Sequence, residues 1–184
     1  ANLRAKLSLG RDVDIFTEFL PQTLDGQPTV KYLTDLTRHT PRDFLMLLTH
    51  IQSAATSDRV TRANILDGAK SYSEQYFLPE IKDELVGYVK PGDFEAFLNC
   101  LGEIHERRFT TARLVTAARS FGIPKVRVEI MLHALFAASA IGMTWTGQSR
   151  QERFEFKFRN THSVFNSHRT IVLHKGLWKV LNLA

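Results

Sequence analysis

The spacing of apolar residues changes near residue 140, and this change limits the folds that the chain can adopt. Before it, the segments 93–106, 110–120 and 125–138 repeat their apolar residues at helical intervals. After it, Met143 to Thr146 alternates strictly, as a half-buried strand does. A helical region followed by a β-hairpin is therefore expected.

The details of this second half predict a winged helix-turn-helix. The tight connection 122–124 joins the second and third helices, and the polar loop 147–152 joins two strands predicted at 143–146 and 154–159. In this arrangement the phenylalanines of the second strand face a core. A further strand is predicted at 170–173 and a closing helix at 175–183.

The first half of the chain is predicted to be helical throughout residues 12–92. Thr40-Pro41-Arg42-Asp43 combines a capping threonine, a proline at the first helical position and an acid in the first turn, which is a strong helix start. Pro79 must kink or end the helix that begins at Thr61, because proline has no N–H to donate. The predicted fold is mainly α, with a helical bundle over residues 1–92 and a winged-helix domain over 93–184.

Charge is distributed unevenly between these halves. Of the 184 residues, 24 are basic and 19 acidic, yet residues 107–184 hold thirteen of the basic residues and only three of the acidic ones. A local excess of positive charge attracts polyanions, of which nucleic acid is the most common. We therefore expect a nucleic-acid partner, DNA rather than RNA. Solubility is the alternative explanation for the excess of charge.

The candidate contacts are basic residues of the predicted second helix, the start of the third helix, and the wing. Contacts spread in this way favour the phosphate backbone over base edges, so we expect low sequence specificity. Pairing of Lys157 and Arg159 with Glu152 or Glu155 is an alternative. The candidates are Arg113, Arg119, Lys125, Arg127, Arg150, Arg153, Lys157 and Arg159.

The outward face of the third helix suggests a competing function. Helical geometry places Val126, Ile130 and Ala137 outward, whereas Val128 and Leu132 point inward. An apolar outward face suits a protein partner better than base edges. The alternative is therefore an interaction or oligomerisation module, including a homodimer.

Nothing in the sequence indicates catalysis. There is no phosphate-binding loop, no nucleophile motif and no histidine pair with metal-ligand spacing, so we expect neither an enzyme, a cofactor nor a metal site. Cys100 lies among apolar residues and is expected to be a buried thiol. No apolar run approaches the roughly 20 residues that cross a bilayer. These features predict a cytoplasmic protein without a membrane partner.

Three stretches together resemble a known family. They are Tyr32 to Phe44 with its Thr-Arg-x-Thr-Pro-Arg-Asp core, Tyr72 to Leu85, and the terminal segments Phe156 to Asn160 and Leu173 to Lys179. They are similar to the C-terminal region of bacterial FunZ-like P-loop ATPases. The resemblance implies that residues 1 to about 90 form a helical lid that follows an ATPase core.

The resemblance also implies a role for Arg42, which matches the position of a nucleotide-sensing lid arginine. An ordinary capping-turn arginine paired with Asp43 or Asp35 is the alternative. The sequence departs from the family because it lacks the phosphate-binding loop and the acidic strand end for magnesium. It is thus either a C-terminal fragment or a stand-alone descendant, and its start at Ala1 without methionine favours a fragment.

Overall fold

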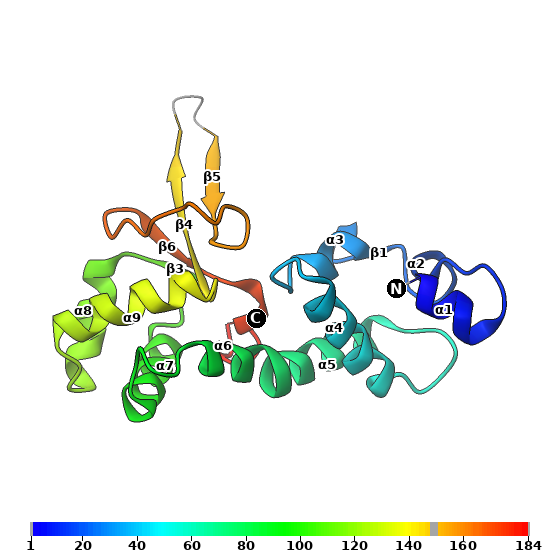
Figure 1. Cartoon of the computed structure of the whole chain (residues 1–184), viewed down its shortest axis with the longest axis horizontal. Helices are drawn as coiled ribbons and strands as arrows, with labels where there is room; N and C mark the ends of the chain where they lie inside the picture. The colour runs from blue at the N-terminus through cyan, green and yellow to red at the C-terminus, as the bar shows by residue number, and fades with distance from the viewer. Residues whose placement is uncertain (1, 148–150, 184) are drawn as a thin grey trace. The chain divides into compact units, whose positions relative to one another are not determined.

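The protein is mainly helical, with small antiparallel sheets (Figure 1). The computed structural model describes residues 2–147 and 151–183. The chain divides into two compact units, Ala1–Tyr76 and Phe77–Ala184. The sequence prediction placed the division at residue 92 instead. It differs because the helix at 78–84 packs with the second unit, where Lys82 pairs with Glu95 at 2.6 Å and lies over the Phe94 ring.

The first unit is built around a pair of helices that pack against each other, α4 and α5 (Figure 1). Both begin as their sequences predict. Thr40 accepts a hydrogen bond from the Asp43 N–H at 3.0 Å, and Thr61 and Asn64 form a capping box. The elements are α1 (Asn2–Leu9), α2 (Ile15–Glu18), β1 (Thr23–Leu24), β2 (Gln27–Pro28), α3 (Thr29–Thr34), α4 (Pro41–Ala54) and α5 (Arg62–Tyr72).

The α4–α5 contact is very close. Gly68 of α5 lies against the backbone of Ile51 in α4, where a Cβ on residue 68 would come within 2.5 Å of the Ile51 Cα. The two helices are joined further by the hydrogen bond between His50 Nδ1 and Ser71 Oγ, at 2.9 Å. Leu47 and Ile65 are fully buried beside this crossing, so it forms the core of the first unit.

The expectation of helix throughout residues 12–92 is wrong at one turn. β1 and β2 form a two-residue hairpin around Asp25 and Gly26, both of which have positive φ (50° and 78°). Asp-Gly is a preferred pair for such turns because both central residues must adopt left-handed backbone angles. The α1 helix, which precedes this region, was not predicted.

Pro79 distorts its helix without ending it. Residues Ser73–Phe77 form a π-helical turn, and the chain continues directly into α6 (Leu78–Glu84), with Pro79 in its first turn. Proline cannot donate the hydrogen bond that a continuous α-helix requires there, and a wider turn accommodates the loss. The boundary between the two units falls inside this turn.

The second unit combines helices with a four-stranded antiparallel sheet in the order β3-β6-β4-β5. The β4–β5 hairpin extends away from the helices of its unit (Figure 1). β6 confirms the strand predicted at 170–173 and lies between β3 and β4. The elements after α6 are α7 (Pro91–Ile104), β3 (Arg108–Phe109), α8 (Thr111–Ser120), α9 (Lys125–Ala137), β4 (Ile141–Thr146), β5 (Glu152–Glu155) and β6 (Thr170–Leu173).

Two predictions for this unit are wrong. β5 ends at Glu155, so residues 156–159 lie beyond the strand, and Phe154 is exposed while Phe156 is buried. The closing helix at 175–183 is only a 3₁₀ turn over Lys175–Leu177. There the Nδ1 atom of buried His174 accepts the Gly176 N–H, and Asn182 has a positive φ of 54°, which a continuous helix excludes.

No helix among residues 2–147 and 151–183 is long and apolar enough to cross a membrane.

Candidate nucleic-acid interface

All the acidic residues of the stretch 107–184, which belongs to the second unit, form ion pairs. Glu129 pairs with Lys125 at 3.5 Å, Glu152 with Arg108 at 2.6 Å and Glu155 with Arg169 at 3.0 Å. These three are the only acidic residues in that stretch of sequence. Because the basic residues of the stretch outnumber its acids by ten, the stretch keeps a large net positive charge.

Two of these pairs stabilise arginines against aromatic rings of the sheet. The Arg169 guanidinium lies 3.7 Å from the centre of the Trp145 ring, and that of Arg108 lies 5.1 Å from the centre of the Phe154 ring. Opposite residues of an antiparallel ladder share a face, so the pairing of Trp145 with Arg153 places a further cation beside this tryptophan. The sheet thus carries cations on both faces.

The residues predicted to contact nucleic acid fall into two groups. The first group is paired within the unit: Arg113 with Glu106, Lys125 with Glu129, and Arg127 with Asp93. Arg127 and Asp93 are 34 positions apart, so the sequence alone does not show this pairing. Surface pairs of this kind are weak, and salt screens them.

The second group has no carboxylate partner within the described part of the chain. Arg119 lies in the last turn of α8, where its charge also complements the helix dipole, and Arg153 lies in β5. Lys157 donates to the Ser163 carbonyl at 2.8 Å, and Arg159 lies over the Phe158 ring. Both follow β5, so the predicted position on a strand face is wrong for them. Arg150 lies outside the described residues.

The outer face of α9 is arranged as predicted. Val126 and Ile130 are 60% and 51% exposed, and Val128 and Leu132 are fully buried. Val126, Ile130 and Ala137 line a groove of about 710 Å³, whose other wall includes Tyr88.

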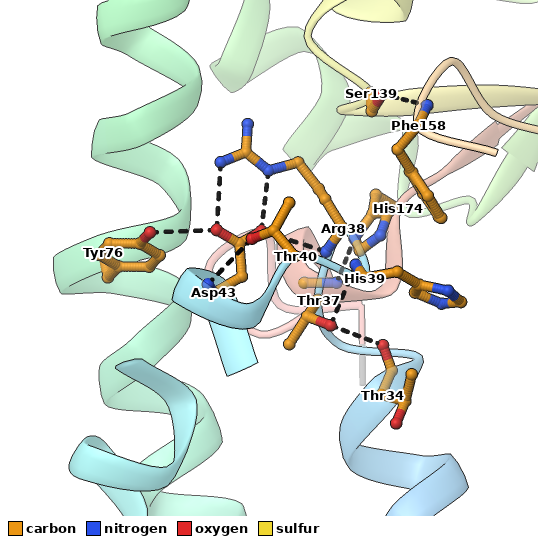
Figure 2. Close-up of polar contacts among 11 residues, drawn as sticks. Thr34, Thr37, Arg38, His39, Thr40, Asp43, Tyr76, Ser139, Phe158 and His174 are labelled. Atoms are coloured by element: carbon orange, nitrogen blue, oxygen red, sulfur yellow. Dashed lines mark hydrogen bonds and ion pairs between the residues drawn. The ribbon is translucent and has the colours of Figure 1, made fainter. Parts of the chain in front are cut away.

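The first unit has a buried polar centre that the sequence prediction missed. The Asp43 carboxylate, 1% exposed, accepts hydrogen bonds from the Arg38 Nε at 3.0 Å and the Tyr76 hydroxyl at 3.0 Å (Figure 2). It also accepts from the Arg38 backbone N–H at 3.2 Å. All three residues stand in the stretches that carry the family resemblance, but only folding brings position 43 next to position 76.

Arg42 lies beside this centre on the first turn of α4. Its guanidinium is 5.8 Å from the centre of the Tyr76 ring. Asp43 is paired with Arg38 and Asp35 with Lys31, at 2.7 Å. The nucleotide-sensing role of Arg42 stays a prediction.

The Asp43 site makes the stability of the first unit depend on pH. Burial alone would raise the pKa of Asp43, but the hydrogen bonds and charge of Arg38, with the Tyr76 hydroxyl, hold that pKa below its ordinary value. The site therefore contributes stability above the ordinary pKa of about 4, and the contribution falls as pH drops through the lower folded-state pKa. We expect the Asp43→Asn variant to show a weaker pH dependence of the free energy of unfolding below about pH 4, as measured by urea unfolding. A variant that keeps the wild-type slope would contradict this assignment.

The histidines do not form a metal site within the described ranges, where no group of three or more His, Cys, Asp and Glu is placed to hold an ion. His174 is instead a core residue: its ring stacks on Phe77 at 4.8 Å and meets Phe156 edge-on at 5.5 Å. Across the same unit, Ser139 Oγ accepts the Phe158 N–H at 3.0 Å (Figure 2). These contacts hold the segment after β5 in place.

The helical first unit, with its capped α4 and buried Asp43 site, is the part of the chain that has known counterparts. Residues 1–78 match the FunZ-associated C-terminal helical domain. The resemblance to a FunZ C-terminal region is thereby confirmed for residues 1–78, and the match ends two residues into the second unit. No curated protein and no solved structure matches the chain.

Proposed function

We propose that the second unit is a winged-helix module that binds nucleic acid, DNA in preference to RNA, through the phosphate backbone. The order α7-β3-α8-α9-β4-β5 supports this, since a helix-turn-helix corner followed by a hairpin is the winged-helix order. In this proposal α8 and α9 form the corner and the β4–β5 hairpin is the wing. β6, the further strand predicted at 170–173, pairs with β4 and enlarges the sheet beyond the hairpin.

The observation that carries the proposal is the unbalanced charge of residues 107–184. The three acids there are already held in ion pairs, and thirteen basic residues stand against them. Nucleic acid offers a dense row of negative charges, and each phosphate that a cation neutralises releases counterions. The charge excess thus favours binding without reference to base sequence.

The cations without a carboxylate partner in the described residues are the best candidates for these contacts. They are Arg119, Arg153, Lys157 and Arg159. Before Arg113, Lys125 or Arg127 could contact a phosphate, each would have to break its existing ion pair with a carboxylate. The apolar outer face of α9 offers few donors to base edges, which supports low sequence specificity.

The family resemblance extends this proposal to a larger protein. In a P-loop ATPase, a helical lid followed by this basic module would couple the nucleotide state of the ATPase core to DNA engagement. This chain would then contribute no catalysis by itself, and Arg42 would face the nucleotide of the core. Sequence upstream of Ala1 that contains a phosphate-binding loop would support this arrangement.

We expect the chain to bind a short DNA duplex with an affinity that falls steeply with salt. Each phosphate contact contributes about 0.9 to the slope of log affinity against log salt, so Arg119→Gln with Arg153→Gln should lower that slope by about 1.8. Fluorescence anisotropy with duplexes of two unrelated sequences, from about 50 to about 200 mM salt, measures it. The matched control removes two exposed arginines from the first unit, Arg11→Gln with Arg59→Gln.

The control should leave the slope unchanged, and the two sequences should bind within a few-fold of each other. Absence of binding at about 50 mM salt, where phosphate contacts are strong, would refute the proposed function. Binding with an unaltered slope in the Arg119–Arg153 variant would refute the assignment to these two residues. Much tighter binding of one duplex sequence would refute backbone-only contact.

A further inference from the structure

The groove along α9 is unusual because both of its walls present apolar side chains to solvent. Val126 and Ile130 stand on the helix, and Tyr88, 75% exposed, stands opposite. Val86 beside it is 74% exposed. A second hollow of about 280 Å³ continues past the same Tyr88 and Ile130. Contiguous apolar surface of this kind marks a docking surface.

The side chains along the groove differ in size from one end of α9 to the other. The first half of the helix lines the groove with Val126, Glu129 and Ile130, whereas the lining residues after His133 are the small Ala134, Ala137 and Ala138. A second α9 running in the opposite direction would place its bulky half over this small half. The distribution of side-chain sizes therefore favours the antiparallel orientation.

Charge favours the same orientation. The first turn of α9 contains Lys125 and Arg127 and no acid, and its last turn contains no basic residue. Cations near a helix N-terminus oppose the helix dipole, whereas cations near a C-terminus are favourable. In an antiparallel pair, Lys125 of each helix lies near the uncompensated C-terminal end of the other.

We propose that the occupant of this groove is α9 of a second copy of the chain, related by a twofold axis that passes between residues 131 and 132. In this homodimer, Val126 packs on Ala137 of the second copy, and Ile130 lies opposite His133 of the second copy. The Tyr88 side chains cover the flanks. The proposal is independent of the phosphate contacts proposed for Arg119, Arg153, Lys157 and Arg159, because none of these residues lines the groove.

The size of the contact surface sets the expected affinity of the dimer. A helix of 13 residues is about 20 Å long, and one such helix with its groove offers less than the roughly 800 Å² per partner of a standard interface. The dimer should therefore be weak, with a dissociation constant on the order of 10 μM. Two copies on one DNA would bind more tightly than either alone, through avidity.

Sedimentation velocity without nucleic acid tests the dimer. The 21.0 kDa chain should double its mass as its concentration rises through the micromolar range. Ile130→Glu should keep it monomeric over that range. Val164→Glu changes an apolar residue of the same unit that lies outside the groove and is even more exposed, at 76%, and this variant should dimerise like the wild type. A wild type that stays monomeric at about ten times the expected constant would refute the proposal.

Cysteine crosslinking tests the orientation. The chain has one cysteine, Cys100, which is fully buried and so gives little background. A mixture of Val126→Cys and Ala137→Cys chains should form a disulfide-linked dimer under mild oxidation, because these positions face each other across the axis. Neither variant alone should form a disulfide-linked dimer. The two copies of either position would lie about 16 Å apart, beyond the roughly 7 Å between Cα atoms that a disulfide can span.

Crosslinking of Val126→Cys alone would show a parallel pair and overturn the antiparallel arrangement. Crosslinking in none of the samples, together with a mass that Ile130→Glu does not change, would show that the groove does not bind a second copy.

Discussion

Asp43→Ala should destabilise the first unit by about 3–5 kcal/mol, enough to unfold many domains of this size. The carboxylate is buried together with Arg38, whose side chain is 10% exposed. Without Asp43, the Arg38 guanidinium loses this buried ion pair and the Tyr76 hydroxyl loses this hydrogen bond. Removing one partner of a buried ion pair is strongly destabilising, even though an intact buried pair is often no more stabilising than apolar residues in the same place. Asp43 also donates its N–H to the cap of α4, but the alanine variant keeps that donor.

The two units can be followed separately in this experiment. Both tryptophans, Trp145 and Trp178, lie in the second unit, so tryptophan fluorescence reports on that unit alone. Urea unfolding followed by far-UV circular dichroism includes the first unit. In the Asp43→Ala variant, the circular-dichroism transition of the first unit should move to a lower urea concentration, while the midpoint of the fluorescence transition should not change. Asp12→Ala removes an exposed ion pair, with Lys6, and should cost less than about 1 kcal/mol.

Equal losses in Asp43→Ala and Asp12→Ala would contradict the buried charge pair. A shift of the fluorescence transition that matches the loss by circular dichroism would show instead that the two units unfold as one.

Features that depend on neighbours in sequence were predictable. The cap at Thr40 needs only the residues that follow it, and the buried and exposed faces of α9 follow from helical geometry alone. The Asp25–Gly26 turn was equally predictable, because the Asp-Gly dipeptide by itself indicates a tight turn. It was missed because residues 21–27, between the helical segments predicted at 12–20 and 28–38, were given no structure of their own.

Features that depend on distant contacts were not predictable. Tyr76 bonds Asp43 across 33 positions, and Arg108 pairs with Glu152 across 44. The basic residues of the candidate interface could be named from the sequence, but the pairing of Arg127 with Asp93 could not. The alternation from Phe154 onward predicted a longer strand, yet the pairing with β4 ends at the Met143–Glu155 pair.

Gly68→Ala should destabilise the first unit by a net amount of about 2 kcal/mol, although alanine is the better helix former. The added Cβ would meet the Ile51 Cα at 2.5 Å and the Ile51 N at 2.7 Å, both backbone atoms that cannot rotate away. Overpacking of this kind costs about 3 kcal/mol, and the helical preference of alanine returns about 1 kcal/mol. Urea unfolding followed by far-UV circular dichroism measures the difference.

The control is the same substitution at Gly102, in the last turns of α7, where a Cβ would meet nothing within 4 Å. Gly102→Ala should therefore be neutral or stabilise the second unit by up to about 1 kcal/mol. Opposite signs for two identical helical substitutions would show that Gly68 is required for the close approach of α4 and α5. If Gly68→Ala is stabilising as well, these helices must lie further apart in solution. The His50–Ser71 hydrogen bond, which spans the same crossing, would then have to lengthen with them.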